Sequence, residues 1–263
     1  MNPTNFVNMQ ITFEKYQAAG NDFVVIDNRS TNFPKEKAII EKICDRKFGI
    51  GSDGLILIEE SQDSEFNMVF FNPDGSQSLC GNGCRAAIRF AESLKIATKS
   101  TSFNAFDGPH KGEIKGKTIT LQMANVQNGR NVESGIFLDT GSPHVVLFVD
   151  DVEQVDVIGE GRKWRNSGLF GKGGTNVNFV EIQDNNDLYV RTYERGVENE
   201  TLSCGTGVTA AALAASLKGC NSPATIKTKG GILTVSFSVN KNGFENIWLE
   251  GPAEHVFSGI IHL

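Results

Sequence analysis

Most of the chain alternates between short apolar runs and clusters of turn residues. The runs are rich in β-branched and aromatic residues and are separated by Gly, Asn, Asp or Pro, which is typical of β-strands. The turn-like segment Asn240 to Gly243 between two such runs indicates a hairpin. The pattern predicts strands over 11–16, 23–27, 55–59, 68–72, 118–123, 136–140, 145–149, 176–182, 188–193, 224–228, 233–239, 246–250 and 256–261.

Helical periodicity occurs over 34–47, 81–96 and 205–218. The last two helices share their opening sequence. Cys80 is followed by Gly-Asn-Gly and Cys204 by Gly-Thr-Gly, and three alanines coincide further along at 86/210, 87/211 and 91/215. Two alanine-rich helices could share alanines by chance. A shared Cys-Gly-x-Gly is harder to explain in that way, because glycine costs helix stability.

Each of these helices also follows a predicted strand that ends in polar residues, and the two cysteines lie almost half a chain length apart. We therefore infer a duplicated strand–loop–helix unit. The predicted fold is α/β (α+β), with two pseudo-symmetric domains. Each domain is expected to be a mostly antiparallel or mixed sheet wrapped around a central helix, with the active site in the cleft between the domains.

The two cysteines have a setting that suits acid/base chemistry. The first N–H groups of a helix lack intrahelical partners, and the helix start carries partial positive charge, which favours a thiolate and a bound carboxylate. Gly-x-Gly after each cysteine allows close approach to a ligand. Two thiols on opposite faces of an α-carbon can remove a proton from one side and return one to the other, which inverts the stereocentre. The remaining cysteines are interpreted as small buried residues: Cys44, Cys84 and Cys220.

Composition narrows the classes of partner and cofactor. A net charge of −6 argues against nucleic acid and anionic membranes, since phosphate binding needs a basic face. The first residues lack the pattern of a signal peptide, and no apolar helix reaches membrane-spanning length. Five cysteines, an odd number, favour reduced thiols and a cytoplasmic location. The cysteines and four scattered histidines show no zinc-site spacing, so we expect no metal.

Four motifs in order resemble those of the diaminopimelate epimerases. They are GNDF at 20–23, NPDGSQSLCGNGCR at 72–85, GSPH at 141–144 and YERGVENETLSCGTG at 193–207. The resemblance covers essentially the whole chain from about Met9. It implies cofactor-independent epimerisation of LL-2,6-diaminopimelate to the meso isomer, for lysine and peptidoglycan precursor synthesis. It further implies that the last strand returns to the first domain, so that the domains span 1–126 with 251–263, and 127–250.

The resemblance also implies roles for individual residues. Cys80 and Cys204 are the acid/base pair. Donors to the α-carboxylate are Gly81, Asn82, Gly205 and Thr206. The amino groups and the distal carboxylate are held by Asn21, Asn72, Asn176, Glu194 and Arg195, although the last two could instead form a surface ion pair. His144 lies near the site in the family, and a structural hydrogen-bonding role for it is at least as well supported.

The sequence departs from the family pattern at three places. Ser142 stands where Asn is usual, Gly54 where many members have Gln, and the loop at 197–199 is one residue longer. These changes leave the cysteines intact but affect how the distal end of a substrate is held.

Three alternative functions stay open: a proline or hydroxyproline racemase, a cysteine nucleophile enzyme with His144 as base, and a non-catalytic amino-acid binder. The sequence is also compatible with a homodimer.

One further glycine motif is set aside. Residues 49–54 match G-x-G-x-x-G, but a helix-like stretch precedes them and a strand follows. A dinucleotide site needs the opposite order, so nucleotide binding is not predicted.

Overall fold

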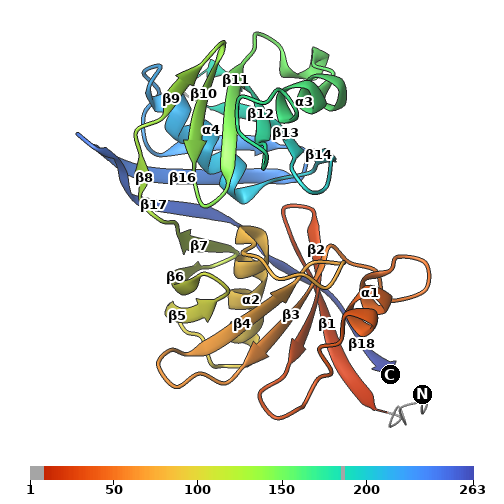
Figure 1. Ribbon diagram of the computed structural model, residues 1–263. Helices are drawn as coiled ribbons and strands as arrows, with labels where there is room; N and C mark the ends of the chain where they lie inside the picture. The colour runs from red at the N-terminus through yellow and green to blue at the C-terminus, as the bar shows by residue number, and fades with distance from the viewer. Residues whose placement is uncertain (1–8, 185–186) are drawn as a thin grey trace. The chain divides into compact units, whose positions relative to one another are not determined.

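The computed structural model describes residues 9–184 and 187–263 (Figure 1). The chain separates into two compact units. One comprises the residues up to Ile119 together with Ala253–Leu263, and the other comprises Thr120–Pro252. The domain boundaries predicted from the sequence, 1–126 with 251–263 and 127–250, stay a prediction.

The first unit is a mixed sheet in the order β18-β1-β2-β3-β4-β5-β6. Neighbouring strands are antiparallel except for β2 with β3 and β4 with β5, which are parallel. The long helix α2 contacts β1, β2, β3, β4, β6 and β18, so the sheet curves around it. The elements are β1 (Gln10–Ala18), β2 (Asn21–Asp27), α1 (Lys37–Cys44), β3 (Gly54–Glu59), β4 (Phe66–Phe71), α2 (Gly81–Ser93), β5 (Ser100–Ala105), β6 (Gly108–Lys115) and β18 (Glu254–His262).

The second unit has the order β9-β10-β11-β12-β13-β15-β16-β17-β8. Its parallel pairs are β11 with β12 and β13 with β15. Strand β14 pairs with β13, and β7 (Thr118–Gln122) contains the boundary between the units. The remaining elements are β8 (Val126–Gln127), β9 (Arg130–Val132), β10 (Gly135–Asp139), β11 (Pro143–Phe148), η1 (Val152–Gln154), α3 (Val157–Arg165), β12 (Asn176–Ile182), β13 (Leu188–Glu194), β14 (Asn199–Thr201), α4 (Gly205–Ser216), β15 (Ala224–Thr228), β16 (Gly231–Asn240) and β17 (Gly243–Pro252).

The two units repeat one topology. Six strands in each, β1 to β6 and then β10, β11, β12, β13, β15 and β16, follow the same series of antiparallel and parallel pairings. Helix α2 lies between the fourth and fifth strands of its series, and α4 occupies the same place in the other. The predicted fold class, two pseudo-symmetric domains each built around a central helix, is confirmed.

The central helix α4 packs closely against its sheet because its side chains are small. Ten of the twelve residues of α4 are buried, and most of those are alanine, glycine or another small residue. Small residues let strands β10 to β13 and β15 to β17 approach the helix closely. Leu213, which is fully buried, is its largest core residue.

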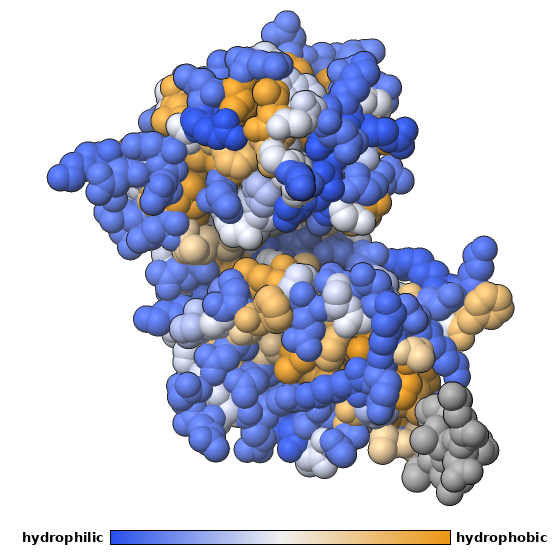
Figure 2. Space-filling view, viewed as in Figure 1, coloured by the Kyte–Doolittle hydropathy of each residue, from blue (hydrophilic) through white to orange (hydrophobic). Residues whose placement is uncertain are grey.

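The surface seen in Figure 2 is mostly hydrophilic, with apolar residues in smaller patches. Isolated exposed apolar residues are ordinary on folded proteins. Within the described residues, no helix is long and apolar enough to cross a membrane.

The structure differs from the sequence-based expectation in several elements. The helix expected over 34–47 is shorter and begins at Lys37, after Pro34. Strands β5, β6, β8, β9 and β14 and helix α3 were not predicted. The turn between β16 and β17 is confirmed, because Asn240 pairs with Gly243 and this glycine has a φ of +143° that favours glycine.

Candidate active site: two cysteines at two helix starts

Cys80 is the N-cap residue of α2. Its backbone is extended (φ −131°, ψ 109°), and its Sγ accepts a hydrogen bond from the Gly83 N–H at 3.4 Å. A Cβ on Gly83 would lie 3.3 Å from Met68 Cε and 3.4 Å from Cys80 Cβ. Gly83 therefore lets the first helical turn pack closely around the thiol, as the Gly-x-Gly motif predicts.

Two amides surround Cys80. Asn21 Oδ1 lies 3.7 Å from Cys80 Sγ and accepts a hydrogen bond from Asn82 Nδ2 at 3.2 Å. Asn21 Nδ2 in turn donates to Asp53 Oδ2 at 2.6 Å. Asn21 comes from the start of β2 and Asn82 from the first turn of α2, so the fold brings together two of the predicted site residues with the cysteine.

Asn72 has a different setting. It follows β4, and its Nδ2 is within hydrogen-bond distance of Ser76 Oγ at 3.0 Å and Ser78 Oγ at 3.1 Å. The Asn72 N–H also donates to the Ser76 carbonyl at 2.8 Å. These bonds shape the loop that leads to Cys80, which is a structural role that the sequence did not indicate.

Cys204 is the N-cap residue of α4 and repeats the backbone of Cys80, with φ −126° and ψ 114°. The Cys204 side chain is buried, and its Sγ lies 3.4 Å from Thr206 Oγ1. A Cβ on Gly207 would lie 2.5 Å from Asn178 Oδ1 and 3.2 Å from Cys204 Cβ, so only glycine fits here. The two helix starts therefore share cap residue, dihedral angles and close packing.

His144 is fully buried beneath Thr206. Its Nε2 lies 2.9 Å from Thr206 Oγ1, and its Nδ1 lies 3.0 Å from Asn178 Nδ2. Because the Asn178 amide donates to Nδ1, the proton of the neutral ring is on Nε2 and is donated to Thr206. Burial, with the positive charge of Arg195, lowers the pKa of His144 to about 3. The ring is therefore neutral at neutral pH.

The other predicted residues of this unit surround the end of β13. Asn176 Nδ2 donates to Ser142 Oγ and to the Pro143 carbonyl, both at 2.9 Å, and Asn176 Oδ1 accepts from the Arg195 N–H at 2.8 Å. Glu194 Oε2 accepts from Thr201 Oγ1 at 2.9 Å. Asn176 thus ties two loops of this unit together, and Ser142, one of the departures from the family pattern, is one of its partners.

Three polar residues around the helix starts were not assigned roles from the sequence. Thr140 Oγ1 donates to the Thr206 carbonyl at 2.9 Å, Asn178 orients His144, and Asp53 orients Asn21. A signal for Asn178 existed, because it is two residues from Asn176 on β12 and alternate strand residues lie on the same face. The contacts of Thr140 and Asp53 depend on chain segments distant in sequence.

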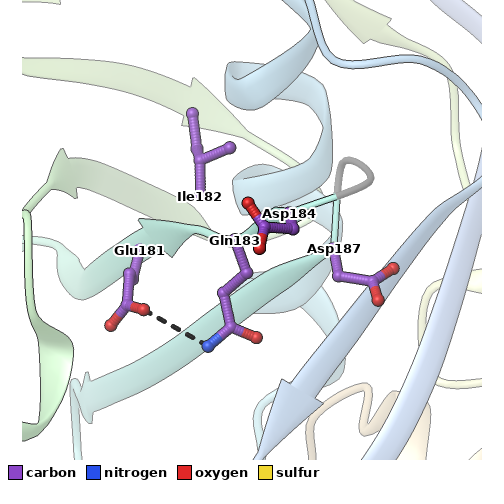
Figure 3. Close-up of a pocket in the computed structure, with 5 residues that line it drawn as sticks. All are labelled: Glu181, Ile182, Gln183, Asp184 and Asp187. Atoms are coloured by element: carbon purple, nitrogen blue, oxygen red, sulfur yellow. Dashed lines mark hydrogen bonds between the residues drawn. The ribbon is translucent and has the colours of Figure 1, made fainter.

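No cluster of three or more His, Cys, Asp or Glu side chains in the described residues is arranged to hold a metal ion. A separate open pocket lies at the far end of β12 from Asn176 and is lined by Glu181, Ile182, Gln183, Asp184 and Asp187 (Figure 3). Gln183 Nε2 donates to Glu181 Oε1 at 3.2 Å there. This pocket contains neither cysteine and is not the candidate site.

Comparison with known proteins agrees with these features. The chain matches the family model of diaminopimelate epimerase over residues 13–129 and 136–256. It is 50% identical to the diaminopimelate epimerase of Flavobacterium psychrophilum over 94% of this chain and 98% of the relative. It is 40% identical to that of Aquifex aeolicus over 94% and 96%.

Solved structures share the fold at low identity. A PhzF-family phenazine biosynthesis protein of Bacillus anthracis has a TM-score of 0.76 at 14% identity, covering 97% of this chain and all of that one. A hydroxyproline epimerase of Agrobacterium vitis has a TM-score of 0.67 at 14% identity, covering 97% and 93%. With the family model matching most of the chain and a relative at 50% identity, the resemblance inferred from the four motifs is confirmed: the chain belongs to the diaminopimelate epimerase family.

Proposed function

We propose that this protein converts LL-2,6-diaminopimelate to meso-diaminopimelate, with Cys80 and Cys204 as the proton-transferring pair. The observation that carries the proposal is the repeated geometry of the two cysteines. Each is the N-cap of the central helix of its unit, with nearly the same dihedral angles, and each is followed by Gly-x-Gly. Membership of the family supplies the substrate.

The chemistry follows from the helix starts. The first N–H groups of α2 and α4 are aimed beyond the helix end and carry partial positive charge. They stabilise the substrate α-carboxylate and the negative charge that develops as the α-proton leaves. One thiolate removes the proton while the other thiol delivers one to the opposite face, so the configuration inverts and the two thiols exchange protonation states. The proposal requires both thiols to reach one α-carbon.

The substrate-binding residues are assigned from the positions of the two helix starts and from membership of the family. Donors to the α-carboxylate are the first two residues of each helix: Gly81, Asn82, Gly205 and Thr206. The amino groups and the distal carboxylate are assigned to Asn21, Asn72, Asn176, Glu194 and Arg195. The guanidinium of Arg195 suits a carboxylate because it can donate two parallel hydrogen bonds. His144 supports Thr206 through its Nε2–H rather than contacting the substrate.

The test is proton NMR of LL-diaminopimelate in D2O with reduced protein and no added metal or pyridoxal phosphate. We expect the meso isomer to appear with deuterium at one α-carbon. Cys80→Ser and Cys204→Ser should each lower turnover by several orders of magnitude, whereas Cys220→Ser is the matched control and should stay near wild type. Near-wild-type turnover by either of the first two variants would refute the two-thiol mechanism. Exchange on L-proline or trans-4-hydroxy-L-proline in place of diaminopimelate would refute the substrate.

We further propose a homodimer in the cytoplasm. Strand β18 pairs with β1 yet leaves Val256, Phe257 and Ile260 about half exposed, and an apolar exposed strand suits a second copy of the chain. All five cysteines are free thiols, as expected in a reducing compartment. Light scattering after size exclusion tests the dimer: a mass of twice 28.6 kDa is expected, and a monomer at assay concentration refutes it.

A further inference from the structure

Arg85 carries a charge in the interior of the first unit. It lies one turn into α2 after Cys80 and is fully buried, the largest side chain of the described residues to be so. Its Nη2 donates to Asn82 Oδ1 at 2.7 Å and its Nη1 lies 3.5 Å from the Gly81 carbonyl. Its Nε has no hydrogen-bond partner in the described part of the chain. Arginine is almost never buried in this way unless it is paired with an anion.

Arg85 begins a chain of hydrogen bonds in which each side chain donates to the next, and the chain ends at Asp53. The guanidinium can only donate, so Asn82 presents its oxygen to Arg85 and its Nδ2 to Asn21. The carboxylate of Asp53 can only accept, so Asn21 presents its Nδ2 to Asp53 and its Oδ1 to Asn82 and Cys80. A donor at one end and an acceptor at the other thereby fix both amide orientations around the thiol.

The charge of Arg85 has one candidate counter-ion among the described residues. The ionisable groups that act on the guanidinium are Cys80 and Cys84, while burial lowers the pKa of Arg85 to about 10. Burial raises the pKa of the Cys84 thiol well above its usual range, so Cys84 is neutral at neutral pH. No carboxylate is bonded to Arg85 in the described residues. Cys80 is therefore the group that can supply the negative charge.

We propose that Arg85 is a positioning residue for Cys80: its buried guanidinium stabilises the Cys80 thiolate and, through Asn82, holds Asn21 where its oxygen can accept a hydrogen bond from the Cys80 S–H. A thiol that acts as acid and base alternates between a protonated and a deprotonated state, and the contacts arranged by Arg85 stabilise both. In the thiol state Sγ–H faces Asn21 Oδ1, and in the thiolate state Sγ has the Gly83 N–H and the cation. The inference rests on the proposed function for its catalytic meaning, but the ionisation of Cys80 can be measured without substrate.

The experiment is the pH dependence of alkylation of Cys80 by iodoacetamide in ligand-free protein, with the label located by mass spectrometry. Arg85→Met removes the cation, and Arg85→Lys restores a charge without the guanidinium fork. Arg89→Met is the matched control, because Arg89 is the next arginine of the same helix but donates to the Gly116 carbonyl and pairs with Glu92 instead. Thermal unfolding verifies that each variant is folded.

In wild type we expect the midpoint of Cys80 alkylation to lie below about 8.5, the usual pKa of a free cysteine. Arg85→Met should raise it by about one to three pH units, the usual effect of one nearby charge, and slow alkylation at pH 7 about tenfold or more. Arg85→Lys should recover at least half of the shift, and Arg89→Met should not shift it.

A wild-type midpoint at or above that of a free thiol overturns the proposal, even if Arg85→Met does not fold. So does an unchanged midpoint in folded Arg85→Met, or an equal shift in Arg89→Met. Failure of wild type to epimerise diaminopimelate is a separate result that refutes the proposed function and leaves this measurement intact.

Discussion

Acidification should destabilise this protein through His144, and the size of the effect follows from its burial. The imidazole is fully buried, its Nδ1 accepts from Asn178, and its pKa is lowered to about 3 from an ordinary value near 6.5. The unfolded chain therefore takes up a proton below pH 6.5 that the folded protein takes up only near pH 3. The stability that comes from keeping His144 neutral is fully present above pH 6.5 and is lost as the pH falls from 6.5 towards 3.

At pH 5 the loss from this one group is about 2 kcal/mol relative to pH 8, by the linkage relation for a single proton. The figure is insensitive to the folded-state pKa, since a value anywhere at or below 4 leaves the folded ring neutral at pH 5. It is also a large fraction of the stability of an ordinary domain.

The assay is urea denaturation at pH 8 and pH 5 for wild type, His144→Asn and His262→Asn. Protonation of carboxylates also changes the wild-type value, so the informative quantity is the difference between variants. His144→Asn should lose about 2 kcal/mol less than wild type between the two pH values, whereas His262→Asn, which removes an exposed histidine, should follow wild type. Equal losses in wild type and His144→Asn would mean that burial does not keep His144 neutral in the folded protein at pH 5. Nitrogen NMR at pH 5 provides a direct check, with a neutral ring protonated on Nε2 expected.

Three further substitutions test the packing between β3 and β4, the core around α4 and the cap of α3. Gly54→Ala should cost about 1–3 kcal/mol, because its Cβ would overlap the ring of Phe70, and a free energy of unfolding within 0.5 kcal/mol of wild type would contradict the packing. Leu213→Ala should cost about 2–5 kcal/mol by leaving a cavity in the core around α4, measured in the same way. Asp156→Ala should cost about 1 kcal/mol, because it removes the cap that accepts from the Gly159 N–H, without changing epimerase turnover.

The elements that the sequence predicted well are those in which the local pattern and the fold agree. The starts of α2 and α4 were predicted at the correct residue because glycine and alanine after a cysteine mark both. Helix α3 was missed because two glycines interrupt its sequence. The structure supplies the reason for one of them, since a Cβ on Gly161 would overlap Tyr193. Its start is set by the Asp156 cap rather than by an apolar pattern.

Strands β5 and β6 were missed for another reason. They are largely polar, and only Thr101 and Phe103 of β5 are buried. These strands are held by pairing with each other and with β4, which is a tertiary effect that overrides local propensity.

For the candidate site, the sequence indicated which residues would gather but not how they are held. The cysteines and the glycines after them carry a repeated signal within one stretch of chain. The partners that orient the polar side chains come from elsewhere: Asp53 reaches Asn21 from the loop before β3, and Thr140 reaches Thr206 from the loop after β10. Such contacts leave no local pattern, because they depend on strand register and on which loops meet.

The repeated scaffold also explains how two cysteines with the same backbone setting can have different polar neighbours. Duplication fixes what the backbone provides, namely an extended cap residue, a helix start and two glycines, and both units keep these. The second residue of each helix differs, and with it the polar network that reaches the sulfur. Asn82, through Asn21, connects Cys80 to a buried cation, whereas Thr206 connects Cys204 to a neutral histidine. A cation acts on the thiolate over distance, but a hydroxyl acts only through the bond that it donates. We therefore expect substitutions at Arg85 and at His144 to act on the two cysteines independently.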